Sequence, residues 1–214
     1  MAVKLISVLG DSISTFQDYT PPSGVYYAPT FGSVTGVGSA ADCWWMQVIQ
    51  ALGGQLLCND SWSGSTVSIQ GGAMPACSPS RIRRLSKDGL TPNQILIYTG
   101  LNDVERHVPP EVFGADYHSM LRRIQESYPE AQVTCGTLLA GYLGDSPLRQ
   151  FAYFRARLEE YNQAIRAAAA AHGYQVADMA ALGKEYASMD GLHPNGQGMA
   201  QLAALWLESL ELAR

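Results

Sequence analysis

Three residues of the sequence have the types and the spacing needed to activate a hydroxyl group. Ser12 directly follows an apolar run, and Asp190 and His193 lie three positions apart near the end of the chain. A serine hydroxyl is a poor nucleophile until a base removes its proton, and an imidazole does this best when a carboxylate holds its other nitrogen. On a loop or a single helical turn, Asp190 can reach one ring nitrogen of His193 while the other faces Ser12. The three residues therefore predict a nucleophile, a general base and an orienting acid.

Each of these residues also fits an ordinary structural role. A serine at a strand-to-helix turn commonly caps the helix. His193 precedes a proline and fits a surface histidine, and Asp190 followed by glycine is typical of a turn. Taken one at a time, the residues leave both interpretations open, and only their combination favours chemistry.

Acyl transfer to a serine also requires hydrogen-bond donors aimed at the developing oxyanion. Gly64 can present its backbone N–H, since glycine allows the chain to approach a ligand closely. Asn102 can add a side-chain amide, and the backbone N–H of Ser12 is a third candidate donor. Gly64 and Asn102 are also common turn residues, so they carry weight only as part of the joint pattern.

The elements that must bring these residues together are alternating strands and helices. Apolar runs bounded by turn residues predict strands, and apolar spacings of three and four residues predict helices. Strands are expected at 3–9, 55–59, 94–99, 132–136 and 174–177, and the longer helices at 43–52, 111–126, 151–173 and 199–210. Strands that alternate with helices of this length predict a parallel sheet with right-handed crossovers.

Ligands of an open parallel sheet bind beyond the carboxyl ends of its strands. Polar clusters follow three of the expected strands, at 10–12, 59–64 and 100–103, and a fourth, at 190–193, precedes the last helix. We therefore expect the four clusters to meet at one edge of the sheet.

The order and spacing of these clusters resemble those of the SGNH hydrolases, the GDSL esterase/lipase superfamily. The matching blocks are 10–12 (Gly-Asp-Ser), Gly64, 100–103 (Gly-Leu-Asn-Asp) and 190–194 (Asp-Gly-Leu-His-Pro). The resemblance extends from residue 3 to about residue 212, and the first block continues with isoleucine in place of the family's leucine. It implies an α/β fold of three layers, α/β/α, with a flavodoxin-like parallel five-stranded sheet. It also implies a serine esterase that requires no metal and no cofactor.

Carried over residue by residue, the resemblance implies Ser12 as the nucleophile, His193 as the general base and then acid, and Asp190 as the orienting carboxylate. The oxyanion hole would consist of the Ser12 amide, Gly64 and Asn102. Hydrolysis would proceed through an acyl-enzyme, which water activated by His193 would release as the acid.

The substrate is predicted from the loops around the expected site. Residues 18–40 form a long irregular segment rich in Gly, Pro, Ser and Tyr, and such segments are commonly functional. The candidate substrate-binding residues are Asp11, Trp62, Tyr26 and Tyr27. Asp11 and Asp103 also fit structural roles at turns, and the tryptophans, including Trp44 and Trp45, equally fit core or loop anchors. The compact chain without a long apolar lid favours short-chain esters, above all O-acetyl groups on a carbohydrate.

Two alternative functions stay open at this point. One is a lipase, thioesterase or lysophospholipase, and the other is a non-catalytic carbohydrate-binding protein of the same fold. A binding protein has no use for the complete set of catalytic groups, which favours the enzyme. A nucleotide-binding protein would need a phosphate-binding loop, and the sequence has no G-x-x-x-x-G-K-[ST] motif.

The composition of the chain indicates which classes of partner and which location to expect. The 214 residues favour a single domain, 1–214, with an irregular insertion at about 18–40. Nineteen acidic against fourteen basic residues give a formal charge of −5, which argues against nucleic acid. The apolar runs are too short for a membrane span or a signal peptide, so no membrane partner and a cytoplasmic location are expected. The expected partner is a small-molecule or oligosaccharide ester, and the oligomeric state is left open.

Two further patterns in the sequence are expected to have structural roles only. The four cysteines lack metal-ligand spacing and are expected to be reduced, mostly buried thiols. A small basic run, Arg81, Arg83, Arg84 and Lys87, is expected to be a solvated helix face.

Overall fold

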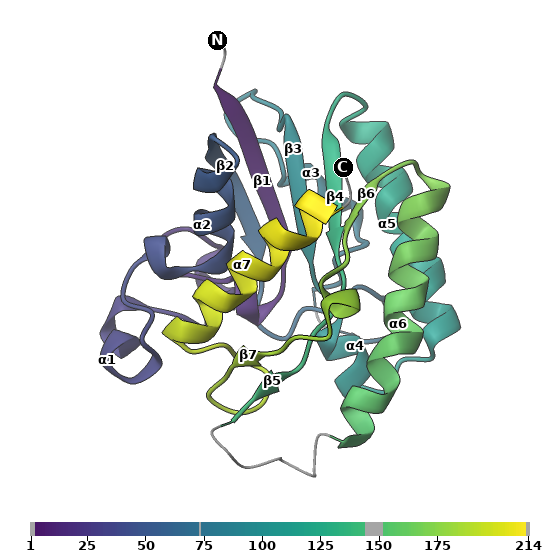
Figure 1. Ribbon diagram of the computed structural model, residues 1–214. Coiled ribbons are helices and arrows are strands. Elements are labelled where there is room, and N and C mark those ends of the chain that lie inside the picture. The colour runs from purple at the N-terminus through teal and green to yellow at the C-terminus, as the bar shows by residue number, and fades with distance from the viewer. Residues whose placement is uncertain (1–2, 73, 144–151, 213–214) are drawn as a thin grey trace.

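The computed structural model describes residues 3–72, 74–143 and 152–212, with the backbone alone for 152–155 and 212. Five strands form one parallel sheet in the order β2-β1-β3-β4-β6, between layers of helices (Figure 1). They are β1 (Lys4–Gly10), β2 (Gly54–Ser61), β3 (Gln94–Tyr98), β4 (Gln132–Gly136) and β6 (Gln175–Ala177). The predicted parallel five-stranded α/β fold is therefore confirmed.

The position of β1 inside the sheet explains why its sequence is continuously apolar. It lies between β2 and β3, and Ile6 and Leu9 are fully buried because helices cover both faces of the sheet. Its neighbour β2 carries one extra residue, Leu57, where the pairing register shifts. A bulge of this kind bends a strand and increases its twist. Beyond it, β2 pairs Ser61 with Gly10 at the end of β1, next to the nucleophile candidate.

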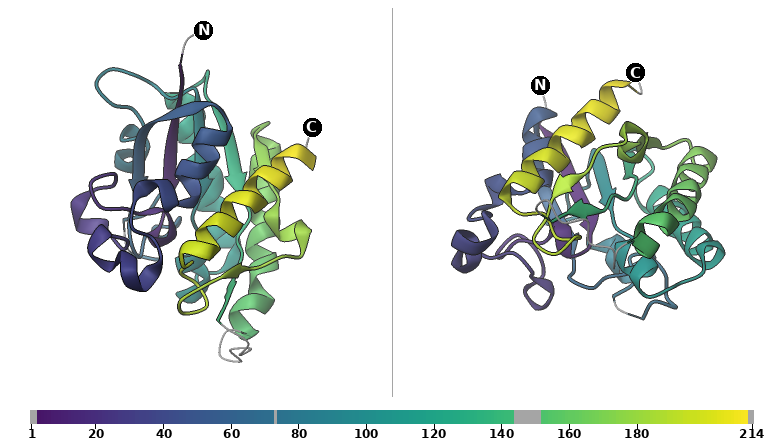
Figure 2. Two further views of the ribbon diagram at one scale, coloured as in Figure 1. Left: turned by 60° about the vertical axis from the view of Figure 1, so that its left-hand side comes forward. Right: turned by 60° about the horizontal axis from the view of Figure 1, so that its bottom comes forward.

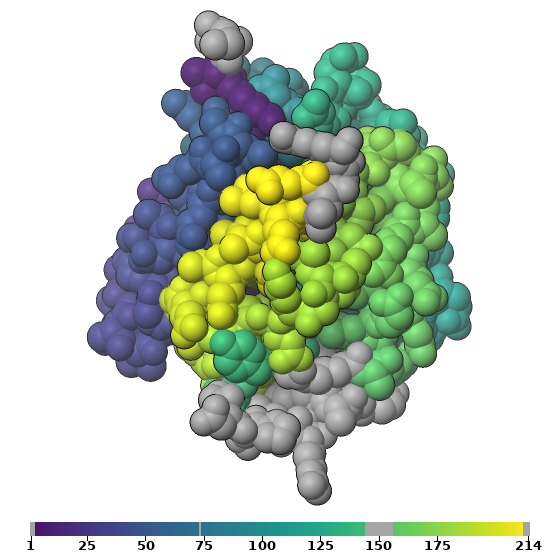
Figure 3. All heavy atoms as spheres, in the orientation of Figure 1, coloured from purple at the N-terminus to yellow at the C-terminus, as the bar shows by residue number. Residues whose placement is uncertain are grey.

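The helices form the two outer layers of the fold. They are α2 (Trp44–Ala51), α3 (Pro79–Arg83), α4 (Leu101–Glu105), α5 (Pro110–Ser127), α6 (Ala152–Ala171) and α7 (Gly196–Leu212). Helices α2 and α7 pack together on one face of the sheet, and α5 and α6 pack together on the other (Figure 2). In the space-filling view, α7 lies between the blue region that contains α2 and the green region that contains α6 (Figure 3). Phe151, expected at the start of α6, lies outside the described residues.

Aromatic side chains join α2 and α7 to the sheet. Trp44 and Trp206 are fully buried and stacked, with ring centroids 4.9 Å apart, and Tyr98 of β3 meets Trp44 edge-on at 5.6 Å. Gly136 leaves space for this cluster, since a Cβ atom there would lie 2.6 Å from the Trp206 ring. Trp44 and its buried neighbour Trp45 are thus core anchors, which agrees with the structural interpretation of the tryptophans.

The segment 18–40 has little regular structure and packs beside the last helix. It contains short 3-10 turns and the four-residue helix α1 (Gly32–Thr35). A Cβ atom on Gly196, the first residue of α7, would lie only 2.2 Å from the carbonyl oxygen of Gly36. This close approach brings the segment next to the loop that precedes α7.

A second, two-stranded sheet is present that the sequence patterns do not predict. Its strands β5 (Gly141–Tyr142) and β7 (Tyr186–Ala187) run parallel. Strands of two residues carry no periodicity, so they leave no recognisable pattern in the sequence. The small sheet is important because the loop from β7 to α7 carries Asp190 and His193.

We predict that Gly198→Ala destabilises the protein, although alanine is the better helix former. A Cβ atom on Gly198 would lie 1.8 Å from the carbonyl oxygen of Ala187 in β7, and backbone at that distance has to move. We expect a loss of about 2–3 kcal/mol in the free energy of unfolding, measured by urea denaturation. Gly114→Ala is the matched control, because its Cβ atom would lie 3.4 Å from Ala164 and alanine should add roughly 0.5–1 kcal/mol. Equal effects of the two substitutions would contradict the role of this contact.

Candidate active site

Ser12 begins a tight turn at the carboxyl end of β1. Asp11 caps this 3-10 turn by accepting a backbone hydrogen bond of 3.1 Å. Two side chains from other elements hold Ser14 in the same turn: the Trp44 indole donates to its hydroxyl, and the Asn59 amide donates to its carbonyl. The position of Ser12 is therefore fixed by long-range contacts, and its exposed fraction is only 6%.

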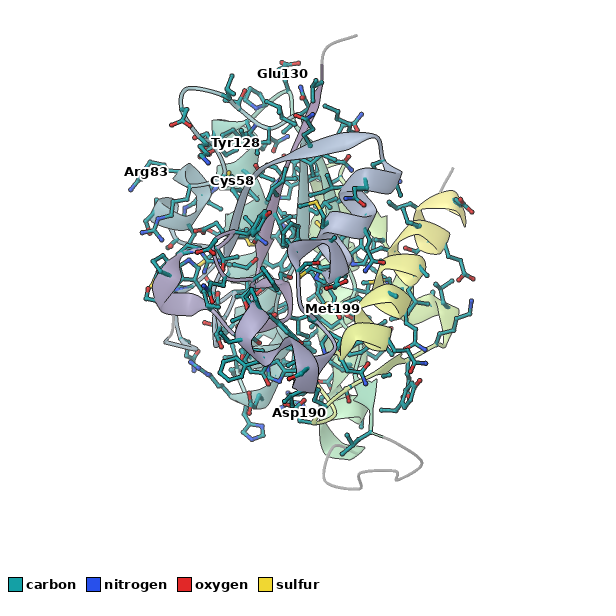
Figure 4. The ribbon with its side chains drawn as sticks, turned by 90° about the vertical axis from the view of Figure 1, so that its left-hand side faces the viewer. Cys58, Arg83, Tyr128, Glu130, Asp190 and Met199 are labelled. Atoms are coloured by element: carbon teal, nitrogen blue, oxygen red, sulfur yellow. The ribbon has the colours of Figure 1, made fainter. Side chains whose placement is uncertain are left out.

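Ser12, His193 and Asp190 form one continuous hydrogen-bonded row. The His193 Nε2 atom lies 2.9 Å from the Ser12 hydroxyl, and His193 Nδ1 lies 2.6 Å from a carboxylate oxygen of Asp190. Figure 4 shows Asp190 at the opposite end of the molecule from Glu130, which precedes β4, so the row lies at the carboxyl end of the strands. The predicted meeting of distant clusters at one edge of the sheet is thus observed for these three residues.

Asp190 is held as a carboxylate by three hydrogen bonds. One oxygen accepts from the backbone N–H groups of Leu192 and His193, at 2.9 and 2.8 Å, and the other faces the His193 ring. Partial burial acts to raise the pKa of Asp190, but the hydrogen bonds from His193 and Leu192 outweigh it and lower the pKa to about 2. The acid beside the imidazole is therefore ionised at neutral pH.

The small sheet holds the loop that carries Asp190 and His193. The backbone N–H of Ser188 donates to the carbonyl of Tyr142 in β5 at 2.8 Å, and the Ser188 hydroxyl accepts from the N–H of Gly191 at 2.8 Å. The loop thus receives its support from a part of the chain that no sequence pattern singled out.

The three candidate oxyanion donors lie at the same edge of the sheet. Gly64 is the third residue of a turn closed by a 3.0 Å hydrogen bond from Ser65 N–H to the Trp62 carbonyl. Its φ of +73° is left-handed, which a glycine adopts without steric cost. The Asn102 amide donates to the Ser65 carbonyl at 2.8 Å, which places it beside the Gly64 turn. An amide nitrogen carries a second N–H, and Asn102 lines the same cavity as Ser12.

Arg81 corrects the expectation that the basic run at 81–87 is a solvated face. Its side chain is fully buried, whereas Arg83, Arg84 and Lys87 are exposed as predicted. Each of its five N–H groups has an acceptor. The acceptors are the Asp60 carboxylate, the Ser65 hydroxyl and the carbonyl oxygens of Gly10, Asp60 and Met74. Burial lowers the pKa of Arg81, and the ion pair with Asp60 opposes this effect.

Two further acids lie buried near the nucleophile. Asp103 accepts hydrogen bonds from the backbone N–H groups of Val67 and Ser68, at 2.7 and 3.0 Å, so it holds a loop as the structural interpretation predicts. One oxygen of Asp11 caps the nucleophile turn, while within the described part of the chain the other has no hydrogen-bond partner. Burial raises the pKa of Asp11 to about 7, against the lowering effect of its backbone hydrogen bond.

A cavity of about 230 Å³ opens beside Ser12. Ile13, Leu101 and Leu192 supply its apolar lining. Its polar lining residues are Asp11, Ser12, Asn102, Glu105, Asp190 and His193. No lysine or arginine is among these lining residues, so the cavity suits an uncharged or cationic ligand better than an anionic one.

Two of the four residues predicted to bind substrate are buried. Asp11 lines the cavity, but only 1% of its surface is exposed. Tyr27 has no exposed surface, and its hydroxyl donates to the carbonyl of Pro194 at 2.7 Å. The prediction that Tyr27 binds substrate is therefore wrong, because its ring and its hydroxyl are both occupied by the protein.

The other two predicted substrate residues differ in where they point. The Trp62 indole donates to Asp60 at 3.2 Å, and Trp62 does not line the cavity, so the structure does not bring it to the nucleophile. Tyr26 is half-buried, and its ring stacks on the His193 ring. Tyr26 is thus in direct contact with His193, the candidate base.

The described residues contain no metal centre of the usual kind. Across residues 3–72, 74–143 and 152–212, no three His, Cys, Asp or Glu side chains are grouped as metal ligands would be. Over the same ranges, no helix combines the length and the apolar character needed to cross a membrane. All four cysteines are free, and three of them are buried, as expected.

Comparisons with known proteins agree with this architecture. The model of the GDSL-like lipase/acylhydrolase family matches residues 8–201. A candidate GDSL-like lipase from Bacteroides ovatus ATCC 8483 is 23% identical, with a TM-score of 0.73 over 99% of this chain and 100% of its own. One from Bacteroides uniformis ATCC 8492 is 25% identical, with a TM-score of 0.71 over 98% and 96%.

A third similar structure is that of a mutant acetyl esterase with an acetate ion. It is 16% identical, with a TM-score of 0.61 over 99% of this chain and 98% of its own, so the likeness concerns the fold. A search among curated proteins gave no match.

We predict that Asp11→Asn stabilises the protein increasingly as the pH rises. A folded-state pKa of about 7, above the ordinary value of 3.8, means that the folded protein holds this proton more tightly than the unfolded chain. The free energy of unfolding therefore falls as the pH rises through this interval, and asparagine removes that dependence. From pH 5 to pH 8 the advantage of the variant should grow by on the order of 2 kcal/mol, measured by urea denaturation. A difference that does not change with pH would contradict the assignment.

Proposed function

The chain belongs to the GDSL-like lipase/acylhydrolase family and is a carboxylic ester hydrolase, and we propose that it is a serine esterase of short-chain esters, most of all O-acetyl groups on carbohydrates. The observation that carries the proposal is the row of contacts through His193. Its two ring nitrogens lie 2.9 Å from the Ser12 hydroxyl and 2.6 Å from Asp190. These are the distances at which an imidazole can accept the serine proton while a carboxylate orients the ring.

In the proposed acylation step, the Ser12 oxygen attacks the ester carbonyl carbon and its proton passes to His193 Nε2. The carbonyl oxygen becomes an oxyanion, which accepts hydrogen bonds from the N–H groups of Ser12, Gly64 and the Asn102 amide. The ionised Asp190 stabilises the imidazolium that forms. When the tetrahedral intermediate collapses, His193 returns the proton to the leaving alcohol, and the acyl group stays on Ser12.

Deacylation repeats the sequence with water in place of the serine. His193 takes a proton from a water molecule, and the hydroxide attacks the acyl carbon. A second oxyanion forms in the same place, and the bond to Ser12 breaks as His193 returns the proton to the serine oxygen. The carboxylic acid leaves, and the enzyme is restored.

The size and charge of the cavity support a short acyl group on an uncharged carrier. Its volume is about 230 Å³, and only three apolar side chains line it. The exposed acid Glu105 and the half-exposed Asp190 border the same space, and carboxylates accept hydrogen bonds from sugar hydroxyls. The acetyl esterase of similar fold, whose structure holds acetate, is in line with an acetyl group as the transferred unit.

We predict that an organophosphonate labels the purified protein covalently at Ser12. The reagent mimics the ester and requires the serine to be activated by its base. Intact mass should rise by one adduct, located at Ser12 by peptide mass spectrometry. Ser12→Ala should remain unlabelled and lose several orders of magnitude in turnover.

A graded comparison separates the nucleophile from the oxyanion donors. Asn102→Ala should still be labelled at Ser12, while its turnover should fall roughly 10²–10³-fold. Labelling at another residue, or full activity in Ser12→Ala, would exclude the proposed mechanism. An unmodified protein would favour a carbohydrate-binding protein without catalysis.

We predict that hydrolysis of p-nitrophenyl esters is fastest for acyl chains of two to four carbons, because the cavity beside Ser12 is small and only partly apolar. Specificity, kcat/KM, is measured for acyl chains from two to twelve carbons, together with acetate release from acetylated oligosaccharides. A preference for chains of eight carbons or more would instead identify a lipase, thioesterase or lysophospholipase. Leu101→Ala is a useful companion variant, because the smaller side chain enlarges the cavity and should shift the optimum to longer chains.

A further inference from the structure

The ring of Tyr26 lies flat against the ring of His193. Their centroids are 4.0 Å apart, and their planes differ by 8°. We propose that Tyr26 is a positioning residue, which holds the imidazole in the plane from which it reaches both Ser12 and Asp190. The inference rests on the proposed function, because only that function makes His193 the base.

The backbone of Tyr26 is tied to the nucleophile turn. Its N–H donates to the Thr15 hydroxyl at 2.9 Å, and the same hydroxyl donates to the carbonyl of Ser12 at 2.9 Å. Thr15 and Ser12 are both buried, so solvent does not compete for these hydrogen bonds. A single hydroxyl thus sets the distance between the stacking residue and the nucleophile.

The next residue ties the same segment to the loop of the base. The buried hydroxyl of Tyr27 donates to the carbonyl of Pro194, directly after His193, at 2.7 Å. The Tyr27 ring also meets the Tyr26 ring edge-on, with centroids 5.0 Å apart. Tyr26 is therefore fixed from both sides, and the segment 18–40 supplies one wall of the catalytic row.

A flat wall on one face of the imidazole has two consequences for catalysis. It opposes tilting of the ring, and a tilt would lengthen both of the contacts that His193 makes in its plane. It also presents the electron-rich face of an aromatic ring to the imidazolium that forms in the transition state. Both effects bear on the proton transfers through His193 rather than on substrate binding, so their loss should lower kcat more than it changes KM.

The alternative role for Tyr26 is a platform that binds the substrate. One face of the Tyr26 ring lies against His193, and Tyr26 is not among the residues that line the cavity beside Ser12. Removing a platform weakens binding and raises KM, whereas removing a positioning wall lowers kcat. Steady-state kinetics therefore separates the two roles.

The test compares Tyr26→Leu with Tyr26→Phe on p-nitrophenyl acetate. Leucine fills part of the space without a flat face, and we expect its kcat to fall roughly tenfold with KM within about twofold of the original protein. Phenylalanine keeps the stack and should restore kcat to within about twofold. Tyr19→Leu is the matched control, because Tyr19 belongs to the same segment, is 45% exposed and packs at a tilt against Trp45 rather than against His193. It should leave both constants unchanged.

A second pair of variants covers the case in which Tyr26→Leu does not fold. Thr15→Val removes the hydroxyl that connects Tyr26 to Ser12 and should lower kcat, whereas Thr15→Ser keeps that hydroxyl and should not. A raised KM with unchanged kcat in Tyr26→Leu would overturn the inference, as would an equal loss in the phenylalanine variant. If Ser12→Ala is inactive while Tyr26→Leu is fully active, the inference fails alone. If Ser12→Ala keeps its activity, the proposed function itself fails.

Discussion

A buried guanidinium connects the strand ends on which the site is built. Arg81 gives one hydrogen bond to the carbonyl that ends β1, two to Asp60 at the end of β2 and one to Ser65 beside the Gly64 turn. Taking this cation out of water is costly unless every donor is paired. All five N–H groups of Arg81 must therefore keep their acceptors, and a displacement of either strand end would leave a buried donor without one. This requirement fixes the turn at Ser12 and the turn at Gly64 relative to each other.

His193 comes from the other end of the chain, and the contacts of Arg81 do not hold its loop in place. The loop of His193 is held by the two-stranded sheet, through the hydrogen bond from Ser188 to Tyr142, and by contacts with Tyr26 and Tyr27. These contacts come from two separate segments, one before α2 and one after β4. Hydrogen bonds of 2.6 and 2.9 Å from one imidazole to two other residues require such independent supports, because a loop alone would not hold the ring in place.

Two aspartates near Ser12 show how environment divides the roles of identical groups. Asp11 is buried with one oxygen unpaired, and its pKa is raised to about 7. Asp190 is half-exposed and accepts three hydrogen bonds, and its pKa is lowered to about 2. Desolvation dominates in the first case and hydrogen bonding in the second. Of the two, only Asp190 is therefore fully ionised as a carboxylate at neutral pH, as the proposed mechanism requires of the acid beside His193.

Local sequence patterns were enough to predict the main strands and helices and to single out Ser12, Asp190 and His193, which the fold brings together. Apolar periodicity acts over neighbouring residues, so the five strands and the long helices were predictable, and strand ends in a parallel sheet must share one edge. The role of Arg81 became apparent only in the folded protein, because in the sequence it is one charge in a basic run that is typical of an exposed helix face. The contacts of Tyr26 and Tyr27, which the sequence suggested as substrate-binding residues, were equally unpredictable. Burial and stacking depend on partners as far away as Pro194, and no local pattern contains them.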